Sequence, residues 1–204
     1  MRDSPRIRRL RTDLKVLESM RADSTILEFE SQGNPPEAYR VRFRGKGLWR
    51  PAPSRAPEIQ EVHEVSIRLG ASYPRSMPEM QWRSQIFHPN ISGAGMVCLG
   101  GYGTYWVPSL NLDELCDMLW DMIRYENFDV TSPYNREAAD WAASQKQYQF
   151  PVDPRPIRDK IAKVAAPPRK QPVTEEDVLF IVGDQGPDAA EPVEPEDPDI
   201  LIIE

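Results

Sequence analysis

FHPNISGAGMVCLGGYGTYW, residues 87–106, places Cys98 between an HPN turn and a glycine-rich segment. The cysteine follows Asn90 by eight residues and precedes Trp106 by eight. Glycines on both sides of Cys98 allow a close backbone approach and leave the thiol open to large partners. The other cysteine, Cys116, lies beside the apolar stripe of a predicted helix, where cysteine is usually a small buried hydrophobe. Cys98 is therefore the candidate for chemistry.

Length and composition narrow the class of protein. The chain has 204 residues, which suffices for one domain of about 150 residues plus a tail. Two cysteines and no signal sequence indicate a reducing, cytoplasmic setting. No apolar run reaches the ~18 residues that a transmembrane helix needs, and cysteines and histidines are too few for a structural zinc site. We therefore expect no membrane segment and no bound metal.

The net charge of −7 hides an asymmetry along the chain. Residues 1–21 carry seven basic and three acidic residues, whereas residues 167–204 carry two basic and eleven acidic ones. Nucleic-acid-binding surfaces combine a basic field with stacking aromatics, and the basic start has no interleaved aromatic residue. We therefore expect no nucleic acid. A surface for a partner protein and an ordinary solvated helix face both remain open.

Hydrophobic periodicity predicts an α+β fold. Helical spacing recurs at residues 4–22, 110–126, 136–149 and 154–164. The alternation typical of strands recurs at residues 25–31, 38–44, 63–69 and 79–83, and the proline-rich residues 48–58 are expected to form a loop. An N-terminal helix, then four strands, then C-terminal helices favours a four-stranded antiparallel meander with helices on one side. His63 is expected on the surface of its strand.

Composition changes at about Pro167. The last 38 residues hold seven prolines and eleven acids, and such a segment cannot build a core. We therefore divide the chain into a catalytic core, residues 1–166, and an acidic, proline-rich tail, residues 167–204. Two short apolar runs flanked by acids interrupt the tail, at Val178, Leu179, Phe180, Ile181, Val182, Ile200, Leu201, Ile202 and Ile203.

The central segment resembles the catalytic core of ubiquitin-conjugating enzymes. That family carries Tyr-Pro and a further proline ahead of FHPNI, a Cys-Leu pair eight residues after the HPN asparagine, and WxP eight residues after the cysteine. The corresponding residues here are Tyr73, Pro74, Pro78, Phe87 to Ile91, Cys98, Leu99, Trp106, Val107 and Pro108. PYNREAADW, residues 133–141, is similar to the family's PYNxEAA element. The resemblance covers roughly residues 5–150 and is most specific over residues 73–141.

The resemblance implies a role for each residue around the cysteine. Cys98 would carry a ubiquitin-like modifier as a thioester, because a thiolate is both a nucleophile and a good leaving group. Asn90 would stabilise the oxyanion of the transfer step or brace the loop that does so. A turn residue bonded to its own backbone is the alternative for Asn90. His88, Pro89 and Trp106 would shape the site.

An acidic residue near the end of the long helix would assist the attacking amine in this family. The amine of a target lysine has an ordinary pKa of about 10.4 and needs help to lose its proton. Asp129 is the nearest acid to the family's position, and Glu126 is the reserve. A loop acid that caps the next helix is the alternative for Asp129.

The same resemblance implies the partners, which are an activating enzyme, a ubiquitin-like modifier, a target protein and, in ligase-dependent members, a ligase. No cofactor is expected, because ATP is used by the activating enzyme. The basic first helix would contact the activating enzyme through Arg6, Arg8, Arg9, Arg11 and Lys15. Each apolar run of the tail would add as a strand to a sheet edge of a modifier or another partner. Packing on this protein's own sheet, or disorder, is the alternative for these runs.

Departures from the family pattern leave other function classes open. The family's GPxxTPYxGG element is absent, and residues 45–58 read GKGLWRPAPSRAPE instead. Such departures favour a distant member, of the kind found in prokaryotic conjugation operons linked to antiviral defence. A non-catalytic scaffold of the same fold, which binds a modifier or its activating enzyme, is the first alternative function. A thiol hydrolase that pairs Cys98 with His88 is the second.

Overall fold

The computed structural model describes residues 3–99 and 106–162. Its elements follow in the order α1 (Pro5–Ala22), β1 (Leu27–Gly33), β2 (Pro36–Trp49), β3 (Glu58–Arg68), β4 (Glu79–Trp82), α3 (Leu112–Ile123), α4 (Arg136–Ser144) and α5 (Asp159–Ala162). The predicted tail runs at residues 178–182 and 200–203 lie outside the described residues, and so do residues 100–105 of the glycine-rich segment.

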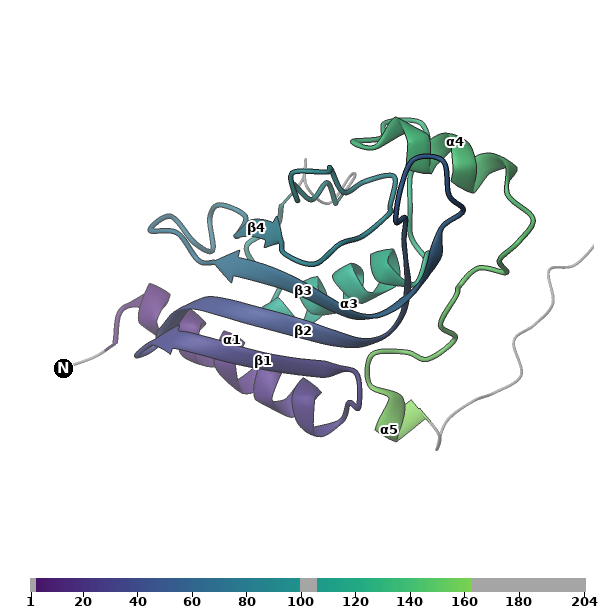
Figure 1. The fold of residues 1–204 in the computed structure, drawn as a ribbon. Helices are drawn as coiled ribbons and strands as arrows, with labels where there is room; N and C mark the ends of the chain where they lie inside the picture. Colours follow the sequence, from purple (N-terminus) through teal and green to yellow (C-terminus); the bar gives the residue numbers. More distant parts are fainter. Residues whose placement is uncertain (1–2, 100–105, 163–204) are drawn as a thin grey trace, which may run out of the picture. The chain divides into compact units, whose positions relative to one another are not determined.

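The four strands form one antiparallel sheet in the order β1-β2-β3-β4. One row of paired residues crosses the sheet, from Phe29 to Val41, Val65 and Trp82. Helices α1 and α3 contact each other and β2, and Figure 1 shows both against one face of the sheet. The predicted α+β meander with helices on one side is therefore confirmed.

Local signals in the sequence explain where the main helices begin. Helix α1 starts at Pro5, and the hydroxyl of Ser4 caps it by accepting a hydrogen bond from the Ile7 N–H at 3.3 Å. Helix α3 starts after Asn111, whose N–H donates to the Glu114 carboxylate at 2.7 Å. Buried apolar residues then face the sheet at helical spacing, so that capping and packing support the same elements.

The predicted proline-rich loop is confirmed over residues 50–57, and only Leu48, Trp49 and Glu58 at its ends belong to β2 and β3. β2 continues to Trp49 through a register shift between Arg44 and Gly47. A Cβ atom at Gly47 would lie 2.6 Å from the His63 ring, and one at Gly45 would lie 2.4 Å from the Trp120 ring. These glycines let β2 pass close over two buried rings before it ends at Trp49.

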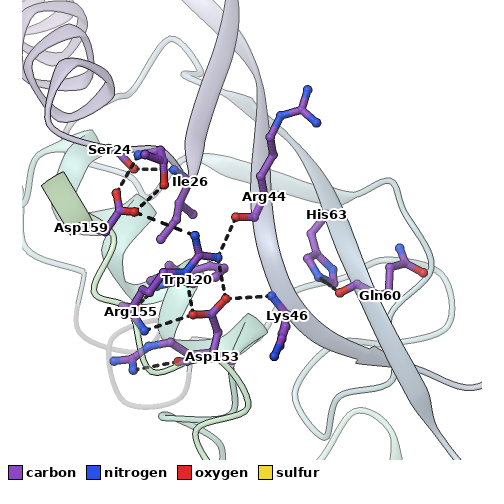
Figure 2. A network of polar contacts seen from close by, with 12 residues as sticks. Ser24, Ile26, Arg44, Lys46, Gln60, His63, Trp120, Asp153, Arg155 and Asp159 are labelled. Atoms are coloured by element: carbon purple, nitrogen blue, oxygen red, sulfur yellow. Dashed lines mark hydrogen bonds and ion pairs between the residues drawn. The ribbon is translucent and has the colours of Figure 1, made fainter.

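His63 is fully buried, which contradicts the prediction of a surface position. Alternation along β3 places His63 on the same face as Val65 and Ile67, and that face meets the core. Its Nε2 atom lies 3.0 Å from the carbonyl oxygen of Gln60, as Figure 2 shows. Burial lowers the pKa of His63 to about 4, so the ring is neutral at physiological pH.

Helix α4 is shorter than predicted, and α5 begins at Asp159, five residues later than predicted. Helix α4 ends at Ser144 because Gln145 adopts an extended backbone and its side-chain oxygen accepts from the Tyr148 N–H at 2.8 Å. Residues 154 and 155, predicted as helix, form with Asp153 a non-helical segment whose side chains hydrogen-bond to β2 (Figure 2). The Asp153 carboxylate accepts from the Lys46 N–H at 3.0 Å and from the Arg155 guanidinium at 2.7 Å.

A buried carboxylate joins α1 to the segment that leads into α3. Asp13 has no exposed surface, and its oxygens accept from the Tyr73 hydroxyl at 2.7 Å, the Arg9 guanidinium at 2.9 Å and the Leu112 N–H at 3.2 Å. The Arg9 guanidinium also donates to the carbonyl of Leu110. Burial raises the pKa of Asp13, while the bonds from Tyr73 and Arg9 oppose the rise. Asp13 therefore ties three segments together.

No helix among the described residues is long and apolar enough to cross a membrane. Over residues 3–99 and 106–162, no three histidine, cysteine or acidic side chains gather in a group that would hold a metal ion.

Replacing Asp13 with alanine will destabilise the fold strongly. The Arg9 guanidinium and the Leu112 N–H would both lose a buried partner, and breaking a buried ion pair costs about 3–5 kcal/mol. Urea unfolding measures this loss. The control is Glu18→Ala, at an exposed position of the same helix, where a change within about 0.5 kcal/mol is expected. Equal stability of the two variants would contradict this account.

Acidification will weaken the fold through His63. Because its folded pKa of about 4 lies below the ordinary value of 6.5, the unfolded chain takes up the proton first as the pH falls. The contribution of His63 is complete above pH 6.5 and declines toward pH 4, by at most about 1.4 kcal/mol per pH unit. Urea unfolding of the wild type and of His63→Leu at several pH values checks this. The wild type will lose stability more steeply, and parallel curves would exclude the effect.

Candidate active site

A short turn brings Cys98 back to Asn90. The Cys98 N–H donates to the Asn90 carbonyl oxygen at 2.9 Å, and Ile91 pairs with Val97 in an isolated antiparallel bridge. The Cys98 side chain is partly exposed. The eight-residue spacing noted in the sequence is therefore the length of this turn, which returns the cysteine to the asparagine.

Glycine at position 95 allows the turn to lie against the sheet. Gly95 has a positive φ of 82°, and its carbonyl oxygen accepts from the Trp82 N–H at 2.8 Å. A Cβ atom there would lie 2.4 Å from the Trp82 carbonyl oxygen, so a larger residue would both strain the backbone and clash. The turn that carries Cys98 is thus fixed to the end of β4.

The Phe87–Asn90 turn is buried, and other segments satisfy its backbone carbonyls. The Phe87 carbonyl accepts from the Tyr125 hydroxyl. The Pro89 carbonyl accepts from the N–H groups of Tyr134 and Asn135, each at 2.9 Å. Buried carbonyls need such partners, so the loop after α3 and the start of α4 are both joined to this turn.

His88 belongs to the frame of the turn. Its ring has no exposed surface and packs edge-on against the Tyr125 ring, with centroids 4.9 Å apart. Its Nδ1 atom accepts from the Asn90 N–H at 3.1 Å, so the neutral ring carries its proton on Nε2. Burial lowers the pKa of His88 to about 3, an effect that the Asn127 backbone partly opposes. With its lone pair engaged, His88 cannot act as a base for Cys98, which argues against the hydrolase alternative.

The Asn90 side chain exchanges two hydrogen bonds with one residue of the loop after α3. Its Nδ2 atom donates to the Asp129 carbonyl, and its Oδ1 atom accepts from the Asp129 N–H, both at 2.8 Å. Asn90 is only 4% exposed. An amide nitrogen carries two protons, and this pairing uses one of them, so Asn90 braces the loop and keeps one N–H for another acceptor.

The three residues that sequence analysis proposed as catalytic lie around one small cavity of about 30 Å³. Leu99 and two methionines of the α3 segment form its apolar side. The residues that line it are Asn90, Cys98, Leu99, Met118, Met122, Asn127 and Asp129. The reserve acid, Glu126, is not among them, and its carboxylate lies 3.4 Å from the Arg124 guanidinium.

The Asp129 carboxylate closes a local turn. Its Oδ1 atom accepts from the Thr131 N–H at 2.7 Å and from the Thr131 hydroxyl at 2.6 Å. These bonds lower the pKa of Asp129, so the group stays anionic at neutral pH. The first-turn cap of α4 is instead Asn135, which accepts from the Ala138 N–H, so Asp129 does not cap that helix.

Tyr125 is a site residue that sequence analysis did not identify. It stands at the end of α3 with a positive φ of 61°, and its ring stacks on Phe150 with centroids 4.6 Å apart. Its hydroxyl is the one bonded to the Phe87 carbonyl. A tyrosine with positive φ is uncommon because its Cβ crowds the backbone, and only the surrounding contacts hold it there. Nothing in the sequence pattern signals this conformation.

Two of the five basic residues assigned to a partner surface are partly buried and bonded to other parts of the fold. Arg6 contacts Glu37 and the Leu69 carbonyl, and Arg9 joins the Asp13 network with a side chain only 13% exposed. Their guanidinium groups are used within the fold. Arg8, Arg11 and Lys15 are exposed, and Arg11 pairs with the Asp3 carboxylate; the contact of this helix with an activating enzyme stays a prediction.

Trp106 supports the exit from the glycine-rich segment. Its indole N–H donates to the Pro74 carbonyl at 2.7 Å, and its ring lies near Tyr73, with centroids 6.4 Å apart. This contact ties the first described residue after the segment to the Tyr-Pro loop. The other cysteine, Cys116, is fully buried on α3, as predicted, and burial raises the pKa of its thiol.

Two curated proteins are similar to this chain in sequence. The alignment with "Ubiquitin-conjugating enzyme E2 16" of Schizosaccharomyces pombe is 34% identical over 76 residues and covers 37% of this chain and 46% of the relative. That with "Nedd8-conjugating enzyme UbcE2M" of Drosophila melanogaster is 35% identical over 75 residues and covers 37% and 40%. The chain thus spans less than half the length of these relatives.

Solved structures share the fold at low sequence identity. "S. cerevisiae Ubc12" matches with a TM-score of 0.56 and 20% identity, over 72% of this chain and 76% of that one. A "putative ubiquitin conjugating enzyme from Plasmodium yoelii" matches with a TM-score of 0.53 and 20% identity, over 71% and 88%. The model of the family described as "Ubiquitin-conjugating enzyme" matches residues 52–153. Because this match covers half of the chain, the chain belongs to the ubiquitin-conjugating enzyme family.

Proposed function

We propose that this protein accepts a ubiquitin-like modifier as a thioester on Cys98 and transfers it to an amine of a target protein, namely a lysine. One observation carries the proposal: a partly exposed thiol shares a cavity with the Asn90 amide, and its backbone is hydrogen-bonded to that same residue. The name of the Drosophila relative, a Nedd8-conjugating enzyme, supports a modifier of the ubiquitin-like class.

In the first step the Cys98 thiolate attacks the thioester that joins the modifier's C-terminal carbonyl to an activating enzyme. A new C–S bond forms to Cys98, the old C–S bond breaks, and the thiolate of the activating enzyme leaves. The exposure of Cys98 and the turn that presents it suit this exchange between two large proteins. Activating enzyme and modifier are thus partners in the first step, and the target protein joins in the second.

In the second step the lysine nitrogen adds to the thioester carbonyl carbon. The carbonyl oxygen becomes negative and accepts from the Asn90 N–H that Asp129 leaves unused. The C–S bond then breaks, Cys98 leaves as a thiolate, and the proton of the amine passes to solvent. The Asp129 carboxylate, which its hydrogen bonds keep anionic, attracts the lysine ammonium to this position before the proton is lost.

Cys98→Ala will abolish the adduct with the modifier. Incubation with ATP and candidate pairs of activating enzyme and modifier, followed by non-reducing electrophoresis, detects a thiol-sensitive band. Cys98→Ser will give a more stable ester, because an alkoxide is a poorer leaving group than a thiolate. The matched control is Cys116→Ala, whose buried thiol takes no part. A normal adduct on Cys98→Ala would refute the proposal, and no adduct on the wild type would favour the scaffold alternative.

Asn90→Ala will charge normally but discharge slowly. Loss of one oxyanion donor slows the chemical step by about 10²–10³-fold, whereas charging depends on Cys98. Single-turnover discharge of the purified thioester to free lysine measures the second step alone. Discharge at the wild-type rate would remove the proposed role of Asn90. A defect in charging as large as that in discharge would assign Asn90 to the structure of the site only.

A further inference from the structure

Tyr125 follows α3 in a backbone conformation that costs free energy. Its N–H donates to the carbonyl of Met122 at 3.1 Å, and its φ of 61° lies in the left-handed region. Glycine is the usual residue where a helix ends in this way, because it has no Cβ atom to crowd the backbone. Strained residues persist where the surrounding contacts hold them, and they gather at functional sites. The Tyr125 side chain is therefore expected to have a use that glycine could not serve.

The Tyr125 hydroxyl is the polar partner of the first carbonyl of the Phe87–Asn90 turn. It donates to the Phe87 carbonyl, and over residues 3–99 and 106–162 no other group donates to that oxygen. Tyr125 is only 1% exposed, and burial raises its pKa, so the hydroxyl keeps the proton that it donates. Without the hydroxyl, a buried carbonyl would have no partner and the turn would have to move to find one.

Tyr125 also connects the two segments that the Asn90 side chain joins. Its ring packs against the His88 ring, with centroids 4.9 Å apart, and the His88 Nδ1 atom accepts from the Asn90 N–H at 3.1 Å. Its backbone begins the loop that reaches Asp129 four residues later. One residue thus contacts the turn that carries Asn90 and leads into the loop that Asn90 braces.

We propose that Tyr125 is a positioning residue for the transfer step, which holds the Asn90 amide at the place where the oxyanion forms. The inference rests on the proposed thioester function, because it names a further residue that this reaction needs. Tyr125 does not line the cavity that holds Cys98, so it acts through Asn90. Displacement of a reacting or stabilising group by about 1 Å can slow an enzymatic step by about 10²-fold, so a small movement of the turn is enough.

Tyr125→Phe removes the hydroxyl and keeps the ring. Single-turnover discharge of the purified Cys98 thioester to free lysine will be about tenfold slower than in the wild type, because the oxyanion donor is misplaced. The maximal rate will fall and the lysine concentration that gives half of it will not change. Charging of Cys98 will keep its wild-type rate, as expected for Asn90→Ala.

Tyr148→Phe is the matched control. The Tyr148 hydroxyl also donates to a backbone carbonyl, that of Pro57 at 2.9 Å. The Tyr148 and Tyr125 rings both lie near Trp141, with centroids 6.1 and 6.2 Å from it. The control thus loses the same kind of hydrogen bond from the same aromatic cluster, but outside the Phe87–Asn90 turn, and it will discharge at the wild-type rate. Urea unfolding checks that both variants are folded.

A double variant separates positioning from a general loss of structure. Because Tyr125 acts through the Asn90 amide, Tyr125→Phe will not slow discharge further once Asn90 is replaced by alanine. A purely structural role would slow discharge by the same factor in both backgrounds, since independent effects on the rate multiply.

Discharge by Tyr125→Phe at the rate of Tyr148→Phe would overturn the inference and leave the thioester function intact. Equal slowing in the Asn90→Ala background would overturn it as well, and so would a charging defect as large as the discharge defect. A Tyr125→Phe protein that is unfolded without urea would assign the hydroxyl to stability alone and overturn the inference. Failure of the wild type to form any thioester on Cys98 would overturn the proposed function, and this inference with it.

Discussion

The paired hydrogen bonds between the Asn90 side chain and the Asp129 backbone are the constraint on which the candidate site depends. They join the HPN turn to the loop after α3, which is 39 residues away in sequence. Cys98 is held to the same asparagine through its backbone N–H. One buried amide thus fixes the position of the thiol relative to the loop that carries Asp129 and Val130. An amide suits this place because it donates and accepts side by side.

Burial of the Phe87–Asn90 turn explains the other contacts that hold the site in place. A buried turn has backbone groups that water cannot reach, so other parts of the chain must satisfy them. Tyr125 supplies its hydroxyl to Phe87, and the start of α4 supplies two N–H groups to Pro89. The backbone carbonyls of Phe87 and Pro89 are thereby satisfied, while the Cys98 thiol stays partly exposed. A rigid buried frame with exposed reactive and binding groups is what precise positioning requires.

Periodicity predicted the fold class, because a local pattern is visible in one dimension, whereas the residues that meet at the cavity were predicted from the resemblance to ubiquitin-conjugating enzymes. The burial of His63 was also predictable, since alternation with Val65 places its side chain on the core face of β3. The prediction of a surface position was wrong because it followed the polarity of histidine and not the position of the residue in the strand. The backbone conformation of Tyr125 was not predictable from the sequence, because a positive φ is normally signalled by glycine or asparagine. The inward direction of Arg9 depends on Asp13, which no spacing rule could pair with Tyr73.

The hydrogen bonds of Asp129 decide which part it can play in transfer. A general base works best with a pKa near the operating pH, whereas the bonds from Thr131 lower the pKa of this carboxylate. Asp129 is therefore a poor general base, and its carboxylate stays negatively charged at neutral pH. A persistent charge attracts an ammonium group over several ångströms but does not remove its proton. In the transfer that we propose, the target lysine arrives charged, so the step that Asp129 would favour is its approach. Loss of the proton would follow as the ammonium group leaves water beside the apolar wall of the cavity.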